Sequence, residues 1–316
     1  YLGTFSDEEL EDWDDKVEES IRLGVRFLMR VNQMDALYGK EVARTNRIGI
    51  GFTGLHEWAW VRWGLGFRDL LDEAGAQPMW DLVKRFSDAA KDEAAIYAQI
   101  LGVEVPHTVT TVKPAGTTSK LYGLTEGAHL PPRRQYLRWV QFKGQKGHDG
   151  KWLDGSDKLL ADYEAKGYPV RELKTFPGMS IVGFPTVPLI AKLGMGDKLV
   201  TAPEATPEEQ YQYLQLLEKY WIGERQGNQV SYTLKVYTDE HTLEGYRDIV
   251  LQYQPTVRCC SVMPCKPDRE MGYEYLPEEE VSLDRFAEIV AGIRDDDLQQ
   301  DIDVATLQCA SGACPI

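Results

Sequence analysis

Long apolar runs are missing from this 316-residue sequence, and nothing resembling a signal peptide opens it. A membrane-spanning helix needs roughly 18 or more consecutive apolar residues, so we expect no membrane association. Methionine is also missing from position 1, where Tyr1 stands. We therefore expect either a processed chain or a piece of a longer one.

Basic residues and cysteines are both scarce. The 35 Lys and Arg stand against 50 Asp and Glu, which gives a formal net charge of −15. This balance argues against a general nucleic-acid surface, which needs a basic face. Five cysteines are too few, and odd in number, for a secreted disulfide framework. We therefore expect a reducing, cytoplasmic location.

Apolar periodicity predicts helices that alternate with short β-branched runs. Ser6 and Glu9 form a capping-box pattern at the start of the first helix. Helices are expected at 6–33, 54–63, 78–102, 207–223, 242–254 and 282–294, and strands at 109–113, 133–142, 228–237 and 255–264. The last two strands flank a helix, so they predict a parallel βαβ unit and an α/β fold class. Residues 144–206 show few periodic runs, and we expect functional loops there.

Two glycine-containing motifs differ in what they predict. GIGFTG at 49–54 matches the dinucleotide fingerprint GxGxxG, but the polar ARTNRI before it is a poor strand. We expect these glycines to let a helix approach its neighbours closely. KPAGTTSK at 113–120 instead offers backbone N–H groups, three hydroxyls and two flanking lysines to one point. That chemistry suits a phosphate, although a Ser/Thr-capped helix start without a ligand would have the same residues.

The five cysteines allow several interpretations. Cys309 and Cys314 lie in the terminal QCASGACPI, where they could form a disulfide, ligate a metal or have no role. Cys259 and Cys260 are adjacent on a predicted strand and point to opposite faces, so with Cys265 they are expected to be packing thiols. Cys260 and Cys265 have the same spacing as Cys309 and Cys314, so a tetrahedral zinc site built from these two pairs is the alternative.

Three stretches carry a family resemblance: RTNRIGIGFTGLHEW at 44–58, TVKPAGTTSKLYGLTEGAHLPPRRQYLRWVQ at 111–141, and CASGACPI at 309–316. Together they resemble the C-terminal half of the class II, adenosylcobalamin-dependent ribonucleotide reductases. The likeness is greatest to the monomeric ribonucleoside-triphosphate reductases. NQVSYTLKVY and TVRCCSVMP look like late barrel strands of that family. The resemblance implies part of a ten-stranded α/β barrel over 1–300, a loop-rich insertion at about 144–206, and a mobile redox tail at 301–316.

The implied reaction replaces the ribose 2′-hydroxyl by hydrogen through thiyl-radical chemistry, with adenosylcobalamin as the source of the radical. The tail dithiol of Cys309 and Cys314 would carry electrons from a thioredoxin-type reductant to the active site. The ribonucleoside triphosphate would be held through its phosphates by Ala115, Gly116, Thr117, Thr118 and Ser119. No cysteine precedes Cys259, so the radical cysteine and its redox pair are expected on an N-terminal half that acts as partner. This chain alone is then expected to be inactive.

Other possibilities stay open from the sequence. A di-iron-dependent reductase fragment would need paired tyrosines near its end, but Phe286 is the only aromatic residue after Tyr275. A non-catalytic, zinc-stabilised nucleotide-binding module is another option. His129 is expected to line the nucleotide or cofactor side or to make an ordinary polar contact. The chain has one cluster of basic residues, which is expected to face either an anionic group or solvent; it comprises Arg133, Arg134, Arg138, Lys143 and Lys146. Contacts with cobalamin are expected in 144–206.

Overall fold

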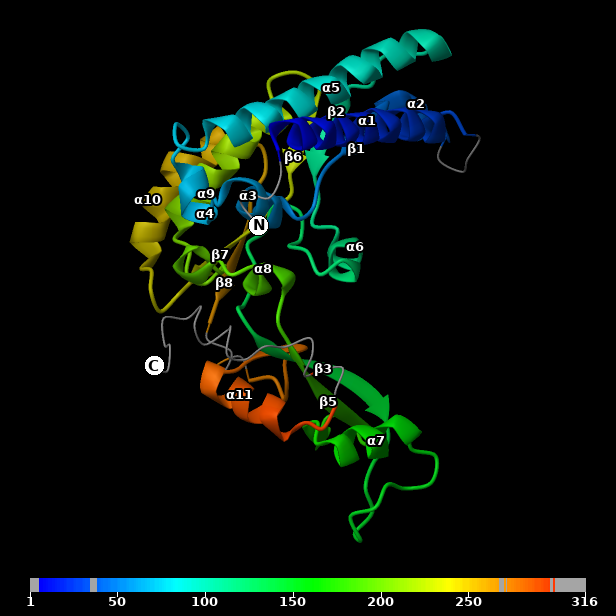
Figure 1. Cartoon of the computed structure of the whole chain (residues 1–316), viewed down its shortest axis with the longest axis vertical. Helices are drawn as coiled ribbons and strands as arrows, with labels where there is room; N and C mark the ends of the chain where they lie inside the picture. Colours follow the sequence, from blue (N-terminus) through cyan, green and yellow to red (C-terminus); the bar gives the residue numbers. More distant parts are fainter. Residues whose placement is uncertain (1–5, 35–38, 267–269, 271, 296–297, 299–316) are drawn as a thin grey trace. The chain divides into compact units, whose positions relative to one another are not determined.

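Two long helices run parallel and cover a small parallel sheet in the computed structural model of the chain (Figure 1). The structure describes residues 6–34, 39–266, 270, 272–295 and 298. They divide into a first unit, 1–131 with 202–265, and a second unit, 132–201 with 266–316. The barrel portion predicted over 1–300 includes residues of both units. None of the described helices combines the length and apolarity needed to cross a membrane.

The first unit contains most of the predicted helices. Its helices are α1 (Asp7–Asn32), α2 (Gly39–Thr45), α3 (Leu55–Trp63), α4 (Phe67–Leu71), α5 (Gln77–Leu101), α6 (Gly116–Leu121), α9 (Pro207–Leu217), a π-helical turn (Glu218–Ile222), α10 (Leu243–Tyr253) and a short 3₁₀ turn (Gln254–Thr256). The predicted capping box of Ser6 and Glu9 is present at the start of α1. Gly102 ends α5 in the left-handed conformation with φ +67°. These predictions are confirmed.

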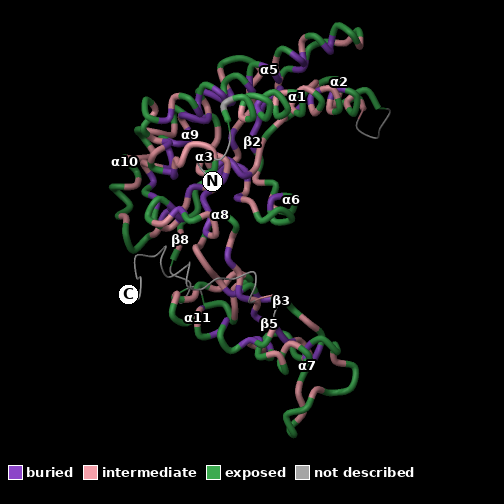
Figure 2. The backbone as a smooth tube through the Cα atoms, in the orientation of Figure 1, coloured by how far each residue is buried: buried purple, intermediate pink, exposed green. Residues whose placement is uncertain are grey.

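Helices α1 and α5 pack in a fixed parallel register. Three side-chain pairs between them, Glu18–Arg85, Arg26–Glu93 and Arg30–Tyr97, are each 67 residues apart in sequence. Beside these polar pairs lie Val25 and Met29 of α1, which are almost wholly buried. Figure 2 shows buried residues recurring along α5, and those packed in one cluster with Val25 and Met29 include Ala90, Ala94 and Ala98. The C-terminal half of α1 is therefore held by both apolar burial and charge pairing.

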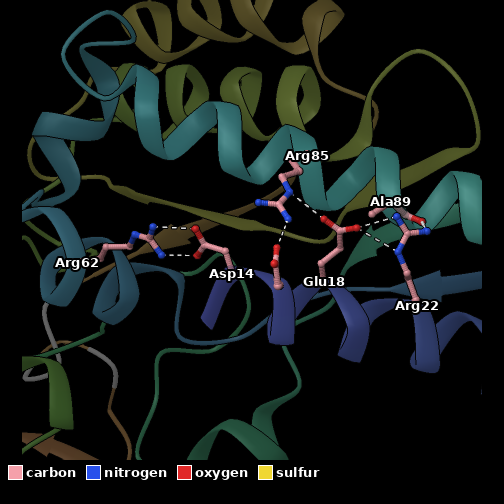
Figure 3. A network of polar contacts seen from close by, with 7 residues as sticks. Asp14, Glu18, Arg22, Arg62, Arg85 and Ala89 are labelled. Carbon is pink, nitrogen blue, oxygen red and sulfur yellow. Dashed lines mark hydrogen bonds and ion pairs between the residues drawn. The ribbon is translucent and has the colours of Figure 1, made fainter. Parts of the chain in front are cut away.

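The N-terminal half of α1 is held mainly by ion pairs, as Figure 3 shows. Arg62 of α3 forms a two-pronged pair with Asp14. Arg85 of α5 donates to Glu18 at 2.8 Å and to Asp15 at 2.5 Å. Apolar burial is weaker here, because Trp13 and Val17 keep 44% and 43% of their surface exposed.

The parallel sheet of the first unit has the order β1–β2–β6, with β1 (Arg47–Ile50), β2 (Thr108–Val112) and β6 (Gly227–Val230). Strand β1 was not predicted, because its sequence RIGI is short and half polar. Glycine has a steric reason here: a Cβ on Gly49 in the strand would lie 2.6 Å from the Thr111 side chain, and one on Gly51, directly after the strand, 2.7 Å from the Thr111 carbonyl oxygen. The expected close approach at GIGFTG is thus between two strands rather than between a helix and its neighbours.

The predicted βαβ unit is present, with a change at each of its strands. Strand β7 (Thr233–Tyr237) pairs in parallel with β8 (Ser261–Cys265) across α10. The predicted strand 228–237 is divided, because the chain leaves the first sheet at Val230 and joins β8 only from Thr233. The prediction that Cys259 and Cys260 lie on the strand is wrong, since β8 begins after them.

The second unit is built on an antiparallel sheet of order β4–β5–β3–β9. Its elements are β3 (Tyr136–Lys143), α7 (Lys158–Lys166), β4 (Val170–Glu172), β5 (Met179–Thr186), α8 (Leu189–Lys192), a 3₁₀ turn (Gly196–Lys198), β9 (Glu278–Glu280) and α11 (Leu283–Gly292). Residues 144–206 therefore hold more regular structure than expected. Strand β5 escaped prediction because it is buried nearly throughout, so it lacks the apolar–polar alternation of a half-exposed strand.

The ion pairs at the start of α1 predict acid sensitivity. Partial burial alone would raise the pKa of Glu18, but hydrogen bonds and charge from Arg22 and Arg85 lower it overall. A carboxylate with a lowered folded-state pKa contributes stability above its unfolded pKa, roughly 4.3, and loses it as the pH falls through the folded pKa. We expect Glu18→Gln to lower the free energy of unfolding by about 1 kcal/mol at pH 7 and to lessen its decline below pH 5.

Urea unfolding followed by circular dichroism between pH 3 and 7 measures this effect. Glu11→Gln is the matched control, because it makes the same change at an exposed position of α1. Equal effects of the two substitutions would contradict a stabilising role for the Glu18 pairs.

Candidate functional site

Three segments meet where β1 and β2 end: the turn 51–54, the segment 113–119 after β2, and the loop 124–129. Gly127 has φ +58°, and a Cβ there would overlap the carbonyl oxygen of Lys113. Gly54 has φ +76°, and a Cβ there would lie 3.1 Å from the side chain of Leu124. Two pairs of chain segments thus approach closely at Gly54 and at Gly127, which explains why both motifs contain glycine although they are far apart in sequence.

The predicted phosphate segment forms the short helix α6 and the residue before it. Ala115 adopts the left-handed conformation with φ +52°, unusual for a residue with a side chain. Thr117 and Thr118 are exposed, whereas Ser119 is fully buried. The Ser119 hydroxyl has no hydrogen-bond partner among the described residues. Buried hydroxyls are normally bonded, so this oxygen marks either a strained contact or a place for a ligand or water.

The carboxylate of Glu57 anchors the loop 124–129. Glu57 lies in the first turn of α3 and is 5% exposed. It accepts hydrogen bonds from the backbone N–H and the hydroxyl of Thr125, both at 2.7 Å. The backbone N–H of Gly54 and the hydroxyl of Thr53 both donate to the carbonyl oxygen of Thr125. Every polar group of Thr125 is therefore bonded to α3 or to the turn before it.

His129 fixes the other end of the same loop. Its Nδ1 donates to the carbonyl oxygen of Glu126 at 3.1 Å, and its Nε2 accepts from the backbone N–H of Thr233 at 3.0 Å. Its ring stacks on Tyr232 with centroids 4.8 Å apart. These contacts define a neutral imidazole with the proton on Nδ1. His129 thus makes an internal polar contact, one of the two roles expected for it.

Burial lowers the pKa of His129 below its ordinary value. Acid then favours the unfolded state, because the unfolded imidazole binds a proton more readily. The stability that neutral His129 contributes is present above pH 6.5 and is lost as the pH falls through its folded-state pKa.

His56 and Tyr213 form a second buried polar pair near the loop. Burial lowers the pKa of His56 to about 4, and its Nε2 has no partner among the described residues. The Tyr213 hydroxyl likewise has none, and burial raises its pKa. Their ring centroids are 5.4 Å apart. Neither His56 nor Glu57 was predicted as a site residue, although both lie in the GLHEW part of a quoted motif.

The cysteine predictions are tested only in part. Cys309 and Cys314 lie outside the described residues. Burial raises the pKa of the Cys260 and Cys265 thiols, so both are protonated at neutral pH. Within the described ranges, no group of three or more His, Cys, Asp or Glu residues could hold a metal ion.

The predicted basic cluster is largely paired within the second unit. Arg133 lies 3.2 Å from Glu280, and Lys146 pairs with Glu164. Arg134 donates to the carbonyl oxygen of Leu199 at 2.6 Å. The four buried polar atoms that lack a partner in the described chain all belong to the first unit. Residues 144–206 thus offer no orphaned buried group that would point to a cobalamin-binding set.

Comparison with known proteins gives this site its context. The chain is 28% identical over 331 residues to the adenosylcobalamin-dependent ribonucleoside-triphosphate reductase of Levilactobacillus brevis, covering 95% of this chain. It is 26% identical over 334 residues to the reductase of the same name from Lactobacillus acidophilus, covering 98%. The resemblance to class II ribonucleotide reductases is confirmed. No protein-family model matches the chain.

A solved structure shows the fold of the chain. The crystal structure of a B12-dependent, class II ribonucleotide reductase superposes with a TM-score of 0.66 at 22% identity, over 91% of this chain and 40% of that one. The chain therefore has the mixed α/β fold of the matching part of that structure. The complete ten-stranded barrel stays a prediction, because the chain spans about two fifths of the length of the relatives that it matches.

The crossing at Gly127 predicts an unusually large cost for one added methyl group. We expect Gly127→Ala to lower the free energy of unfolding by about 3 kcal/mol, since it adds overlap with the backbone to left-handed strain. Gly102→Ala separates these effects, because Gly102 has a similar φ of +67° and open space where the Cβ would lie. That control should cost only about 1 kcal/mol. Urea unfolding of both variants measures the difference; equal costs would contradict the crossing.

Proposed function

We propose that the chain is the C-terminal portion of an adenosylcobalamin-dependent ribonucleoside-triphosphate reductase. It would reduce ribonucleotides to 2′-deoxyribonucleotides once combined with an N-terminal half that carries the radical cysteine. The observation that supports this most directly is the similarity to reductases of that name over 95% of the chain. Those relatives are adenosylcobalamin-dependent, which favours this class over the di-iron alternative.

The substrate's phosphates would bind at 115–119. Backbone N–H groups at the start of α6 point out of the helix without intrahelical acceptors, and such groups favour an anion. The hydroxyls of Thr117 and Thr118 are exposed beside them. The buried Ser119 hydroxyl supplies a donor that the described protein leaves unused. Lys120, which lies 3.5 Å from Glu126, adds positive charge next to the segment.

The loop 124–129 would act as the support of this phosphate site. Gly127 crosses Lys113, the residue that leads into the segment, so neither can shift without the other. Glu57 and His129 hold the two ends of the loop. Such bracing keeps the site in its binding geometry before the nucleotide arrives, which lowers the ordering cost of binding.

Electron transfer would fall to the tail dithiol of Cys309 and Cys314, supplied by a thioredoxin-type reductant. Thiol–disulfide exchange requires a thiolate that reaches the disulfide sulfur directly. The Cys260 and Cys265 thiols fit that role poorly, because burial raises their pKa values. Adenosylcobalamin, when bound, would supply the radical. No described residue is assigned to it, and cytoplasmic location also stays a prediction.

The proposal is tested by combining the chain with its N-terminal half. Adenosylcobalamin- and dithiol-dependent formation of deoxynucleotide is expected, measured by chromatography of the nucleotide products. Ser119→Ala should raise KM about tenfold, since it removes one hydrogen bond to a charged group. Ser180→Ala is the control, because that buried hydroxyl already bonds to the carbonyl oxygen of Gly144 in the second unit. No turnover from a stable assembled complex would refute the assignment.

A second prediction concerns the tail. Cys309→Ser or Cys314→Ser should abolish turnover driven by thioredoxin but leave turnover driven by a small dithiol, which reaches the active site directly. Steady-state rates with each reductant measure the difference. Equal loss with both reductants would contradict the shuttle role of the tail.

A further inference from the structure

A partly open pocket of about 480 Å³ lies in the first unit, apart from the phosphate segment. Its walls come from the middle of α1, the end of β1, the turn 51–54, α3, α5 and the π-helical turn. Its volume falls within the roughly 300–1,000 Å³ of small-molecule sites. The aromatic part of the wall comprises Phe52, Trp58, Phe86 and Trp221, and the aliphatic part includes Ile21 and Ile50.

The polar chemistry of the wall excludes a charged ligand. None of the lining residues carries a charged side chain. Ser20 donates to the carbonyl oxygen of Lys16, Thr53 to that of Thr125, and Trp221 to that of Thr111. None of the four orphaned buried polar atoms of the described chain belongs to a wall residue. A nucleotide would leave its phosphates and base edges without partners here.

The pocket lies beside a part of α1 that is less buried than its C-terminal end. Val25, further along α1, packs fully buried against its neighbours. Nearer the N-terminus, arginine–carboxylate pairs join α1 to α3 and α5, as Figure 3 shows, and Val17 and Ile21 line the pocket. The pocket is lined mainly by apolar groups.

We propose that this pocket binds an uncharged aromatic molecule of two or three rings. Aromatic walls favour edge-to-face and offset contacts with a planar guest. A planar apolar guest gains dispersion contacts with such walls and removes apolar surface from water when it enters. The site is independent of the phosphate segment and of the proposed reaction.

Occupancy of the pocket is coupled to the loop 124–129 through its own wall. Thr53 and Gly54 line the pocket, and both donate to the carbonyl oxygen of Thr125. The backbone N–H of Gly127 donates in turn to the Thr53 hydroxyl at 3.3 Å. A guest that restrains Thr53 therefore restrains the loop that crosses Lys113, and the coupling is reciprocal.

Two fluorescent probes with one scaffold test the site: uncharged N-phenyl-1-naphthylamine and its sulfonate, 1-anilinonaphthalene-8-sulfonate. The uncharged probe should bind one to one, at least tenfold more tightly than the sulfonate. Ser20→Trp, which places a ring in the pocket, should weaken its binding at least tenfold. Leu23→Trp is the matched control, since Leu23 is 52% exposed on the same helix and is not a wall residue.

Intermolecular nuclear Overhauser effects from the probe to the methyl groups of Ile21 and Ile50 give an independent measurement on the unaltered chain. Equal binding of both probes, unchanged binding to the Ser20→Trp variant, or no such contacts would overturn the site. Competition by a ribonucleoside triphosphate would also overturn it, whereas absence of turnover in the assembled enzyme has no bearing on it.

Hydrogen exchange tests the coupling. Saturation with the uncharged probe should slow exchange of the Thr125 and Gly127 amides at least threefold. The Gly183 amide of the second unit, which donates to the carbonyl oxygen of Pro169, is the reference and should not change. Unchanged exchange at Thr125 and Gly127 would refute the coupling, while the probe contacts decide the site itself.

Discussion

The buried carboxylate of Glu57 is the contact through which the candidate site is assembled. A buried carboxylate is costly unless it is well bonded, and here the bonds come from the backbone and side chain of Thr125. The α3 N-terminus adds the favourable end of the helix dipole to the same carboxylate. With Thr125 held on α3, Gly127 is carried across Lys113, and the segment that follows β2 is set in place. One carboxyl group thus joins stretches 68 residues apart in sequence.

This arrangement explains why small residues and hydroxyls cluster in the motifs. Gly54 and Gly127 adopt positive φ and sit where another segment leaves no room for a Cβ. Thr53 and Thr125 supply compact groups that bond across the gap. Larger side chains at these positions would separate the segments. The motif residues are therefore mainly those that allow close packing, and it is the start of α6 that exposes groups to a ligand.

Sequence patterns predicted the elements whose determinants are local. The capping box of α1 and Gly102 at the end of α5 are each read from a few neighbouring residues. Strands β1 and β5 escaped prediction because their character comes from tertiary burial. The division of 228–237 has the same origin, since it depends on where β2 and β8 lie. Where local β-propensity does not determine a strand, its pairing with strands distant in sequence does.

The candidate site, too, was predicted only where its features are local in sequence. The hydroxyl-rich segment was predicted from its composition, but the buried position of Ser119 follows only from the packing of α6. Glu57 and His56 were not predicted as site residues, because an acidic residue in a helical first turn is typical of an ordinary dipole partner and an isolated histidine has no spacing signal. Their importance lies in contacts with residues 125–128, which no periodicity encodes.

Ion pairs and apolar packing contribute in different proportions to holding the two halves of α1. Apolar contacts are short-ranged, so Val25 and Met29 bring the second half close to its neighbours. Ion pairs act at greater reach and weaken with acid and salt, so the first half is held more loosely and conditionally. The turn 51–54 lies beneath this loosely held half and also anchors Thr125. The ion pairs of α1 and the geometry of the phosphate segment are therefore linked, because the turn 51–54 lies next to α1 and also holds Thr125.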